Sequence, residues 1–409
     1  MNKFIEVVNK YVSPLAQKIS RNVWVASLQD AIISTLPLTL VGSVISVLSI
    51  LNEYIPGMPD LSPINTFSFG IIGLALSFVY PVYILQRKKM DSKKYLAGIA
   101  NVGLYIMLTV PGFDDAGNLV LAGDALGTGG MFLGIVAGIF TSLVFISMSK
   151  ISLFKNSDTI PEYILASFDS FLPILVIISV GYIVIFPLNI NFHEVLTSAL
   201  LPLTNFGQSY LGLLSYTLVT TILYSFGISP WLLYGLFYPI QLAGISQNAQ
   251  LIAQGLPAIN INTGEVVQAL ITHGGMGTTL PLAFMLFRSK SKRLKTIGQA
   301  GLVPSLLNIN EPIVFGAPIM LNPLLMIPFW LNSFICTSVA YFALNSNWVN
   351  IPSKVFNLWF IPAPFQAYFA TEDWRGVILA IVVLAISSLI WYPFFKSYEK
   401  EQVMIETEK

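Results

Sequence analysis

The sequence predicts an all-α polytopic membrane protein with about ten transmembrane helices plus two re-entrant hairpins. Of its 409 residues, 55% are hydrophobic and only 10% are charged, whereas a soluble domain is about 25% charged. No Asp, Glu, Lys or Arg occurs between Val195 and Gly264. Long apolar stretches without charge are those that a bilayer accepts, so we expect most of this chain to lie in lipid.

The first 22 residues are a polar leader with apolar positions at helical spacing. Met1–Asn22 carries four basic residues among its apolar ones. This pattern is typical of an amphipathic helix that lies on the membrane surface. The alternative is a polar leader without regular structure. No cleavable signal peptide is visible in this stretch.

Ten apolar segments that are long enough to cross a bilayer follow the leader. They are Val23–Leu51, Ile64–Gln86, Tyr95–Pro111, Thr128–Ser149, Asp169–Ile190, Tyr210–Ile228, Trp231–Ala253, Val266–Phe287, Leu321–Leu344 and Gly376–Phe395. Two further apolar segments, Gly298–Pro318 and Trp348–Phe369, are interrupted by proline. Broken backbone is tolerated at membrane depth only inside protein or beside a water-filled cavity, so we expect these two to be re-entrant.

The basic residues support an even number of spans. Nineteen of the 21 Lys and Arg residues lie in the leader, in three short loops and in the tail after Phe395. With ten spans, all five of these segments fall on one side, and only Lys354 and Arg375 remain on the other. By the positive-inside rule, the basic side is cytoplasmic and holds both termini.

The residue inventory excludes several kinds of chemistry. A single cysteine, Cys336, excludes an internal disulfide and a cysteine metal cluster. Two histidines, His193 and His273, make a histidine metal site improbable, so we expect no metal and no cofactor. The net charge of +1 gives no indication of a nucleic-acid partner.

The most informative stretch is Gly301–Pro318, whose sequence is GLVPSLLNINEPIVFGAP. Its Glu311 is the only charged residue between Lys295 and Lys354. The prolines and glycines around it argue against one straight helix. An acid inside a membrane costs roughly 2.5–3.5 kcal/mol to insert and usually lines a cavity. We therefore predict that Glu311 is buried and binds a ligand; a carboxylate satisfied by backbone amides, or one at the interface, is the alternative.

Two other stretches could share this cavity. Thr272–Thr279 has three glycines that allow close backbone approach to a ligand, and hydroxyls that donate and accept. A helix crossing made possible by glycine is the alternative. Tyr224–Trp231 breaks two apolar helices and by itself predicts only a helical hairpin. One carboxylate with Asn side chains and aromatics, and no Arg or Lys, suits an uncharged polyol.

Five stretches carry a family likeness: residues 36–43 (LPLTLVGS), 126–132 (LGTGGMF), 160–168 (IPEYILASF), 274–280 (GGMGTTL) and 308–312 (NINEP). On these, the chain resembles nearly end to end the membrane-spanning IIC component of the bacterial phosphoenolpyruvate-dependent sugar phosphotransferase system, in its lactose/cellobiose/diacetylchitobiose branch. NINEP is the most specific of the five motifs, and it is intact.

The resemblance implies ten spans, two re-entrant hairpins, a homodimer made through the first five spans and a mobile half that carries the sugar. On this basis the leader is residues 1–22, and the scaffold and dimerisation half is 23–157, with a fifth span to about residue 190. The sugar-binding transport half is 191–395, and the cytoplasmic tail is 396–409.

The resemblance also implies site residues. In the family, the Glu that corresponds to Glu311 hydrogen-bonds sugar hydroxyls, and we expect the same site to include Asn308, Asn310, Gly274, Gly275, Thr278 and Ser229. The family places a histidine after Phe-Gly-Ile, but here Phe226–Ile228 is followed by Ser229, which cannot supply a base near neutral pH. His273 is the candidate replacement as sugar ligand and catalytic base; a hydrogen-bonded structural histidine is the alternative.

The predicted function is a sugar permease of the bacterial cytoplasmic membrane. It binds a β-linked disaccharide of the cellobiose, chitobiose or lactose type, carries it across the lipid bilayer and presents it to a separate soluble, phosphorylated IIB protein. The chain lacks a phosphoryl-carrying residue of its own, so it is part of an enzyme complex rather than a complete enzyme. Two alternatives keep the fold and the sugar site: a facilitator without phosphotransfer, and a sugar-sensing receptor.

Overall fold

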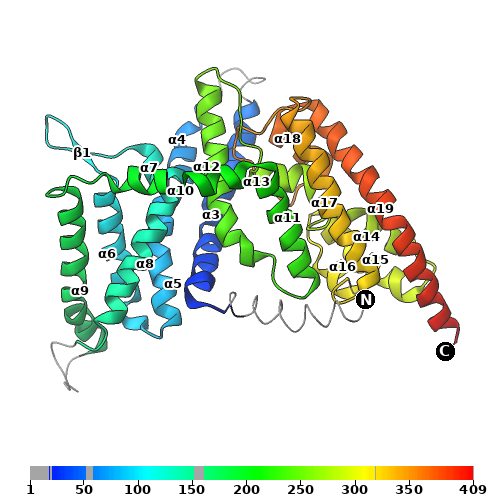
Figure 1. The fold of residues 1–409 in the computed structure, drawn as a ribbon, viewed down its shortest axis with the longest axis horizontal. Coiled ribbons are helices and arrows are strands. Elements are labelled where there is room, and N and C mark those ends of the chain that lie inside the picture. The colour runs from blue at the N-terminus through cyan, green and yellow to red at the C-terminus, as the bar shows by residue number, and fades with distance from the viewer. Residues whose placement is uncertain (1–17, 19–20, 52–58, 152–160, 318, 409) are drawn as a thin grey trace. The chain divides into compact units, whose positions relative to one another are not determined.

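The computed structural model of the chain describes residues 18, 21–51, 59–151, 161–317 and 319–408. The described part is mostly helical, which confirms the predicted class (Figure 1). Its strands are limited to a short antiparallel ribbon of β1 (Gly112–Phe113) and β2 (Leu119–Val120). Most of the leader at 1–22 and the polar residues 155–158 lie outside the described residues.

The helices form two compact units. The first takes residues 20–45 and 51–203, and the second takes residues from 204 onward together with 46–50. The first unit contains α3 (Val23–Leu51, apart from 46–50), α4 (Ser62–Thr66), η2 (Phe69–Ile71), α5 (Ile72–Arg87), η3 (Asp91–Lys93), α6 (Lys94–Leu108), α7 (Gly123–Leu126), η4 (Thr128–Gly130), α8 (Met131–Ser147) and α9 (Glu162–Ile185). The boundary falls within α10 (Phe192–Gln208).

The second unit contains the stretches in which the sequence predicts a site. Its helices are α11 (Tyr210–Ser225), α12 (Trp231–Ala253), α13 (Gly264–Val266), η5 (Val267–Ile271), α14 (Leu280–Phe287), α15 (Lys292–Leu306), α16 (Glu311–Gly316), α17 (Pro323–Asn345), α18 (Ala363–Thr371) and α19 (Trp374–Thr407). Within this unit α11, α17 and α19 pack in that order, so that α17 lies between the other two (Figure 1).

Six helical stretches of the described chain are long and apolar enough to cross a membrane. They are Val23–Ile45, Ser62–Arg87, Thr128–Ser147, Ile164–Ile185, Pro323–Asn345 and Trp374–Thr407. The chain is therefore a multi-pass membrane protein, while the count of ten spans and the re-entrant character of the two hairpins stay predictions.

Three elements differ from the apolar pattern. The pattern does not predict α10, a helix of 17 residues in which polar residues and Pro202 interrupt the apolar ones. The predicted span Val266–Phe287 is not one helix, because its glycine run takes left-handed backbone between η5 and α14. The last helix continues past the predicted end of its span at Phe395 and reaches Thr407.

Polar side chains fix the helix packing in the first unit. The Asn101 amide donates to the carbonyl oxygen of Ser77 (2.7 Å) and accepts from the Thr141 hydroxyl (2.8 Å). These bonds join α6 to α5 and to α8. All three side chains are fully buried, and an unpaired amide would be costly in an apolar interior. This small polar network therefore specifies how three apolar helices pack.

Hydroxyl pairs do the same between α11 and α17 in the second unit. Thr217 Oγ1 lies 2.9 Å from Thr337 Oγ1, and Thr221 Oγ1 lies 2.5 Å from Ser333 Oγ. All four hydroxyls are buried. Small hydroxyl residues let two helices approach closely and bond across the interface in a membrane, so these pairs hold α11 against α17.

The last turns of α19 hold the loop between α14 and α15. Glu399 Oε1 accepts from the Ser289 hydroxyl (2.7 Å) and from the Lys290 backbone N–H (2.8 Å). About two helical turns further on, Glu406 Oε1 accepts from the Ser291 hydroxyl (2.7 Å). These bonds explain why the predicted tail 396–409 is helical as far as Thr407: its acids bind the start of α15.

Candidate functional site

The centre of the site is the loop Thr272–Thr279, which joins η5 to α14. Gly274, Gly275 and Gly277 have φ angles of +77°, +97° and +74°, and Thr278 follows at +51°. Glycine adopts this left-handed region without steric penalty, whereas a side chain at Cβ is strained there. The path of the loop therefore requires the three glycines that the sequence provides.

The glycines also make room for other parts of the protein. A Cβ on Gly275 would lie 2.5 Å from Cγ of Asn310, and a Cβ on Gly277 would lie 2.1 Å from the Phe329 ring on α17. Both distances are too short for any real contact. At Gly275 and Gly277 the space that the sequence predicts for a ligand is therefore filled by the protein itself. The alternative, that these glycines allow close packing within the protein, describes them better.

Two asparagines connect this loop to the NINEP stretch. The Gly274 backbone N–H donates to Oδ1 of Asn308 (2.7 Å). The Asn310 amide donates to the carbonyl oxygen of Met276 (2.8 Å) and to the Thr279 hydroxyl (3.2 Å). The structure therefore brings together two stretches that the sequence singled out separately, about 30 residues apart.

Asn308 also connects to the segment that enters α18. Its amide donates to the carbonyl oxygen of Trp359 (2.6 Å) and to Oε1 of Gln366 (3.1 Å), and its backbone is left-handed, with φ of +59°. Both asparagine amides thus hold the protein's own backbone. Direct sugar binding by Asn308 and Asn310 stays a prediction, and the role visible in the structure is to position the residue that follows.

That residue is Glu311, the first of α16. Its side chain is exposed, and no described residue forms an ion pair with its carboxylate. The prediction that it is buried is wrong for this conformation. The reason is the register of the short helix: Ile313 and Val314 face the core and are fully buried, and Glu311 lies outside this buried face.

An aromatic ring lies on the same side of α16. Phe315 is four residues after Glu311, which places both on one face of the helix, and 52% of its surface is exposed. Its ring meets the Tyr224 ring of α11 edge-on, with centroids 6.1 Å apart. Sequence reasoning missed Phe315, although its spacing from Glu311 is a usable signal. A free carboxylate beside an exposed ring offers hydrogen bonds to hydroxyls and an apolar surface for a sugar face.

The turn between α11 and α12 packs against the loop that leads into α17 and against α17 itself. The Leu321 backbone N–H donates to the carbonyl oxygen of Ser225 (3.0 Å), and the Trp330 indole donates to the Ser225 hydroxyl (3.0 Å). Gly227 has φ of +80° and approaches the sulfur of Met320. Ser229 lies beyond this turn and is exposed, and its hydroxyl oxygen accepts from the Trp231 N–H (3.4 Å). Its hydroxyl proton is therefore available to a ligand.

His273 and Thr278 face inward. The Thr278 hydroxyl donates to the carbonyl oxygen of Ile271 (2.7 Å), while its own carbonyl oxygen accepts from the indole of Trp391 (3.1 Å). His273 is fully buried, and neither ring nitrogen has a hydrogen-bond partner among the described residues. The hydrogen bonds expected for a structural histidine are thus not seen there. In this conformation His273 cannot touch a ligand that occupies the exposed face of Glu311, so its role as base stays untested.

An integral membrane protein with an unpaired carboxylate at a helix break has the arrangement of a solute transporter. The family described as "Phosphotransferase system, EIIC" matches residues 29–333 of this chain. The chain belongs to that family, and it is a sugar permease of the phosphotransferase system.

Several relatives match over almost the whole chain. The cellobiose-specific EIIC component of Geobacillus stearothermophilus is 29% identical, over 99% of this chain and 96% of its own. The lichenan permease IIC component of Bacillus subtilis (strain 168) is 26% identical, over 100% and 96%. The lactose-specific EIICB component of Streptococcus mutans is 27% identical, over 99% of this chain and 74% of its own.

A solved structure has the same fold. The crystal structure of the transporter ChbC, the IIC component of the N,N'-diacetylchitobiose-specific phosphotransferase system, superposes with a TM-score of 0.89. The match covers 98% of this chain and 99% of that one, at 24% sequence identity. At this identity the likeness establishes the fold alone.

Proposed function

We propose that this permease binds an uncharged β-linked disaccharide at Glu311 and carries it inward for phosphorylation. The observation that carries the proposal is the exposed, unpaired carboxylate beside the Phe315 ring. Asn308 and Asn310, in the break just before α16, bond to the glycine loop and so fix the backbone that leads into Glu311. The relatives named for cellobiose, lichenan and lactose support a sugar of this linkage.

A soluble, phosphorylated IIB protein is the proposed partner. In the lactose-specific relatives the name EIICB joins a B component to the C component, and the match covers 74% of that longer chain. Cys336 cannot take the phosphoryl-carrying role here, because it is fully buried in α17. The phosphoryl group must therefore reach the sugar from another protein or from another chain segment.

The test is uptake of a sugar panel into vesicles. The panel is cellobiose, lactose and diacetylchitobiose, each offered to vesicles with and without phosphorylated IIB protein inside. Phosphorylated sugar that accumulates only with IIB supports the proposal. Free sugar that equilibrates equally in both preparations would show a facilitator instead.

The facilitator is the second candidate function because of one observation. Ser229 occupies the position where the family resemblance predicts a histidine, and His273, which could take over that role, is fully buried. A sugar could then cross without any base near its hydroxyl. A sensing receptor has no comparable support in the structure.

We further propose that the protein forms a homodimer through its first half, with both termini in the cytoplasm. The first compact unit, up to Leu203, is the candidate scaffold, and the second is the candidate transport half. The five basic residues between Arg288 and Lys295 then lie on the cytoplasmic side, where a IIB protein would dock.

A single cysteine at Lys292 tests this orientation. The Lys292 side chain is exposed, whereas the neighbouring Ser291 is buried and bonded to Glu406. In a Cys336→Ser background, we expect Lys292→Cys to react with a membrane-impermeant maleimide in inside-out vesicles and not in intact cells. Reaction in intact cells would reverse the proposed orientation. The Cys336→Ser protein alone supplies the blank.

His273→Gln tests the source of the base. Because neither ring nitrogen of His273 reaches the surface, we expect the variant to phosphorylate sugar at a rate within about threefold of the unmodified protein. Loss of a true general base is worth roughly 100- to 10,000-fold. The IIB-dependent vesicle assay separates these results easily. A loss of that size with sugar affinity retained would show that the loop opens and that His273 is the base after all.

A further inference from the structure

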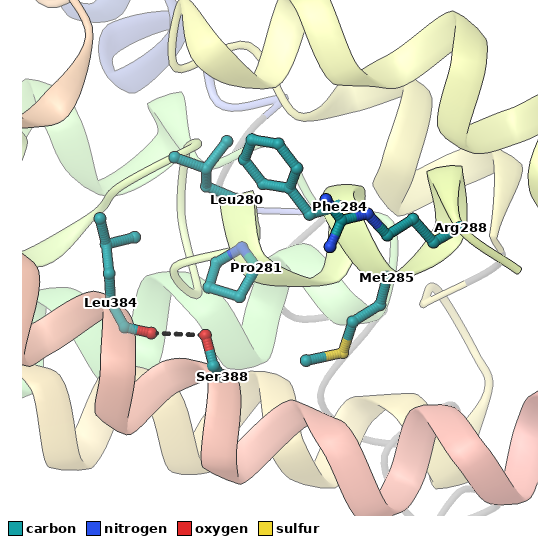
Figure 2. A pocket seen from close by; sticks show the side chains of 7 residues that line it. All are labelled: Leu280, Pro281, Phe284, Met285, Arg288, Leu384 and Ser388. Atoms are coloured by element: carbon teal, nitrogen blue, oxygen red, sulfur yellow. Dashed lines mark hydrogen bonds between the residues drawn. The ribbon is translucent and has the colours of Figure 1, made fainter.

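An apolar groove runs between α14 and α19, and Glu311 is not among its lining residues. Its volume is about 340 Å³. Its lining is almost entirely apolar, and Figure 2 shows the side chains that face it. They include Leu280, Pro281, Phe284, Met285 and Leu384. The one hydroxyl, on Ser388, already donates to the carbonyl oxygen of Leu384 (2.7 Å), so it is not a free donor.

One cation stands in this groove. Arg288, at the end of α14, lines it, and in Figure 2 its side chain extends back along the helix in the direction of Phe284. No described residue forms an ion pair with Arg288. Glu399 on α19, an acid that binds this loop, already accepts from Ser289, Lys290 and Lys396. The Arg288 charge is therefore not neutralised by the part of the protein that the structure describes.

The surroundings add to the positive potential. Four more basic side chains follow within the next seven residues, and all are exposed: Lys290, Lys292, Arg293 and Lys295. The backbone that carries them is held in place by Glu399 and Glu406. A fixed basic segment at the end of an apolar groove on a membrane protein has the chemistry that attracts anionic lipid headgroups.

We propose that this groove binds one anionic phospholipid, with an acyl chain along α14 and α19 and the phosphate on the Arg288 guanidinium. A lipid tail already lies in an apolar medium, so its transfer into the groove gains little free energy, and the groove only fixes the position of the acyl chain. Selectivity must come from the headgroup. A guanidinium forms paired, charge-assisted hydrogen bonds with a phosphate, and a net anionic lipid keeps that attraction, whereas the choline of a zwitterionic lipid opposes it. The proposal depends neither on the sugar nor on phosphotransfer.

The test compares two lipids on the purified, full-length protein in neutral detergent. Dioleoylphosphatidylglycerol and dioleoylphosphatidylcholine are added at equal concentration, and the thermal unfolding midpoint is followed by tryptophan fluorescence. We expect phosphatidylglycerol to raise the midpoint by at least about 2 °C more than phosphatidylcholine does. Native mass spectra should show one retained phosphatidylglycerol per chain. Equal shifts with the two lipids overturn the proposal.

Three variants distinguish lipid binding in the groove from general electrostatic attraction of lipid to the basic segment. Arg288→Gln should abolish the difference between the lipids, and Ser388→Leu, which fills the groove, should abolish it with the charge intact. Lys295→Gln is the matched control, because it removes a charge of the same basic segment that does not line the groove; it should keep the difference. Equal losses in Arg288→Gln and Lys295→Gln overturn the site.

Two further additions exclude other occupants. Inorganic phosphate that reproduces the Arg288-dependent shift would show an anion site without a lipid. Soluble IIB protein that produces the shift, where phosphatidylglycerol does not, would show a protein-docking groove. Either result overturns the lipid assignment.

Discussion

Glu311→Gln should weaken sugar binding by about 10- to 150-fold while the protein keeps its fold. A hydrogen bond to a charged group is worth roughly 1.5–3 kcal/mol, which converts to that range of affinity. The substitution keeps the size of the side chain, removes the charge and replaces one acceptor oxygen by an NH2 donor. Because Glu311 is exposed and no described residue forms an ion pair with it, the free protein should lose almost no stability. Calorimetric titration with the sugar that the unmodified protein binds best measures the change.

A matched control shows whether the effect belongs to the site. Glu401 is also exposed and lies on the last turns of α19, so Glu401→Gln makes the same chemical change away from the sugar. We expect its affinity to stay within about twofold of the unmodified protein. An unchanged affinity in Glu311→Gln would remove Glu311 from the site and leave the exposed Phe315 without its proposed partner.

Composition and charge distribution predict the class of this fold well because lipid imposes a strong constraint. Apolar stretches and basic loops follow directly from the cost of placing charges and unpaired backbone groups in a bilayer. The same reasoning fails at α10 and at Val266–Phe287. The first mixes polar and apolar residues over a helix of 17 residues, and the second is broken by left-handed backbone that hydropathy does not register.

The site was predictable as a set of stretches, not as a set of contacts. The sequence shows that NINEP and the glycine run are unusual, and the structure places them against each other. The sequence cannot show that the side-chain amides of Asn308 and Asn310 donate to backbone carbonyl groups, because those partners lie about 30 to 60 residues away along the chain. The direction of Glu311 depends on the register of a helix of six residues, which a sequence pattern does not determine.

Gly275→Ala should disturb both the fold and the site. An alanine at φ of +97° is strained by about 1–2 kcal/mol. Its Cβ would also lie 2.5 Å from Cγ of Asn310, and such overpacking costs typically 1–3 kcal/mol more. We expect a total loss of about 2–5 kcal/mol in stability. Asn310 immediately precedes Glu311, so sugar affinity should fall by about tenfold or more as the start of α16 shifts.

Gly255→Ala separates the two causes. Gly255 has φ of +74°, and a Cβ there would meet nothing within 4 Å. The variant therefore carries the backbone strain without the contact, and we expect it to lose about 1–2 kcal/mol with sugar affinity unchanged. Thermal unfolding and sugar titration of the two variants then isolate the effect of the Asn310 contact. If Gly275→Ala loses no more stability than Gly255→Ala and binds sugar normally, Asn310 can move without consequence, and the glycine run does not frame Glu311.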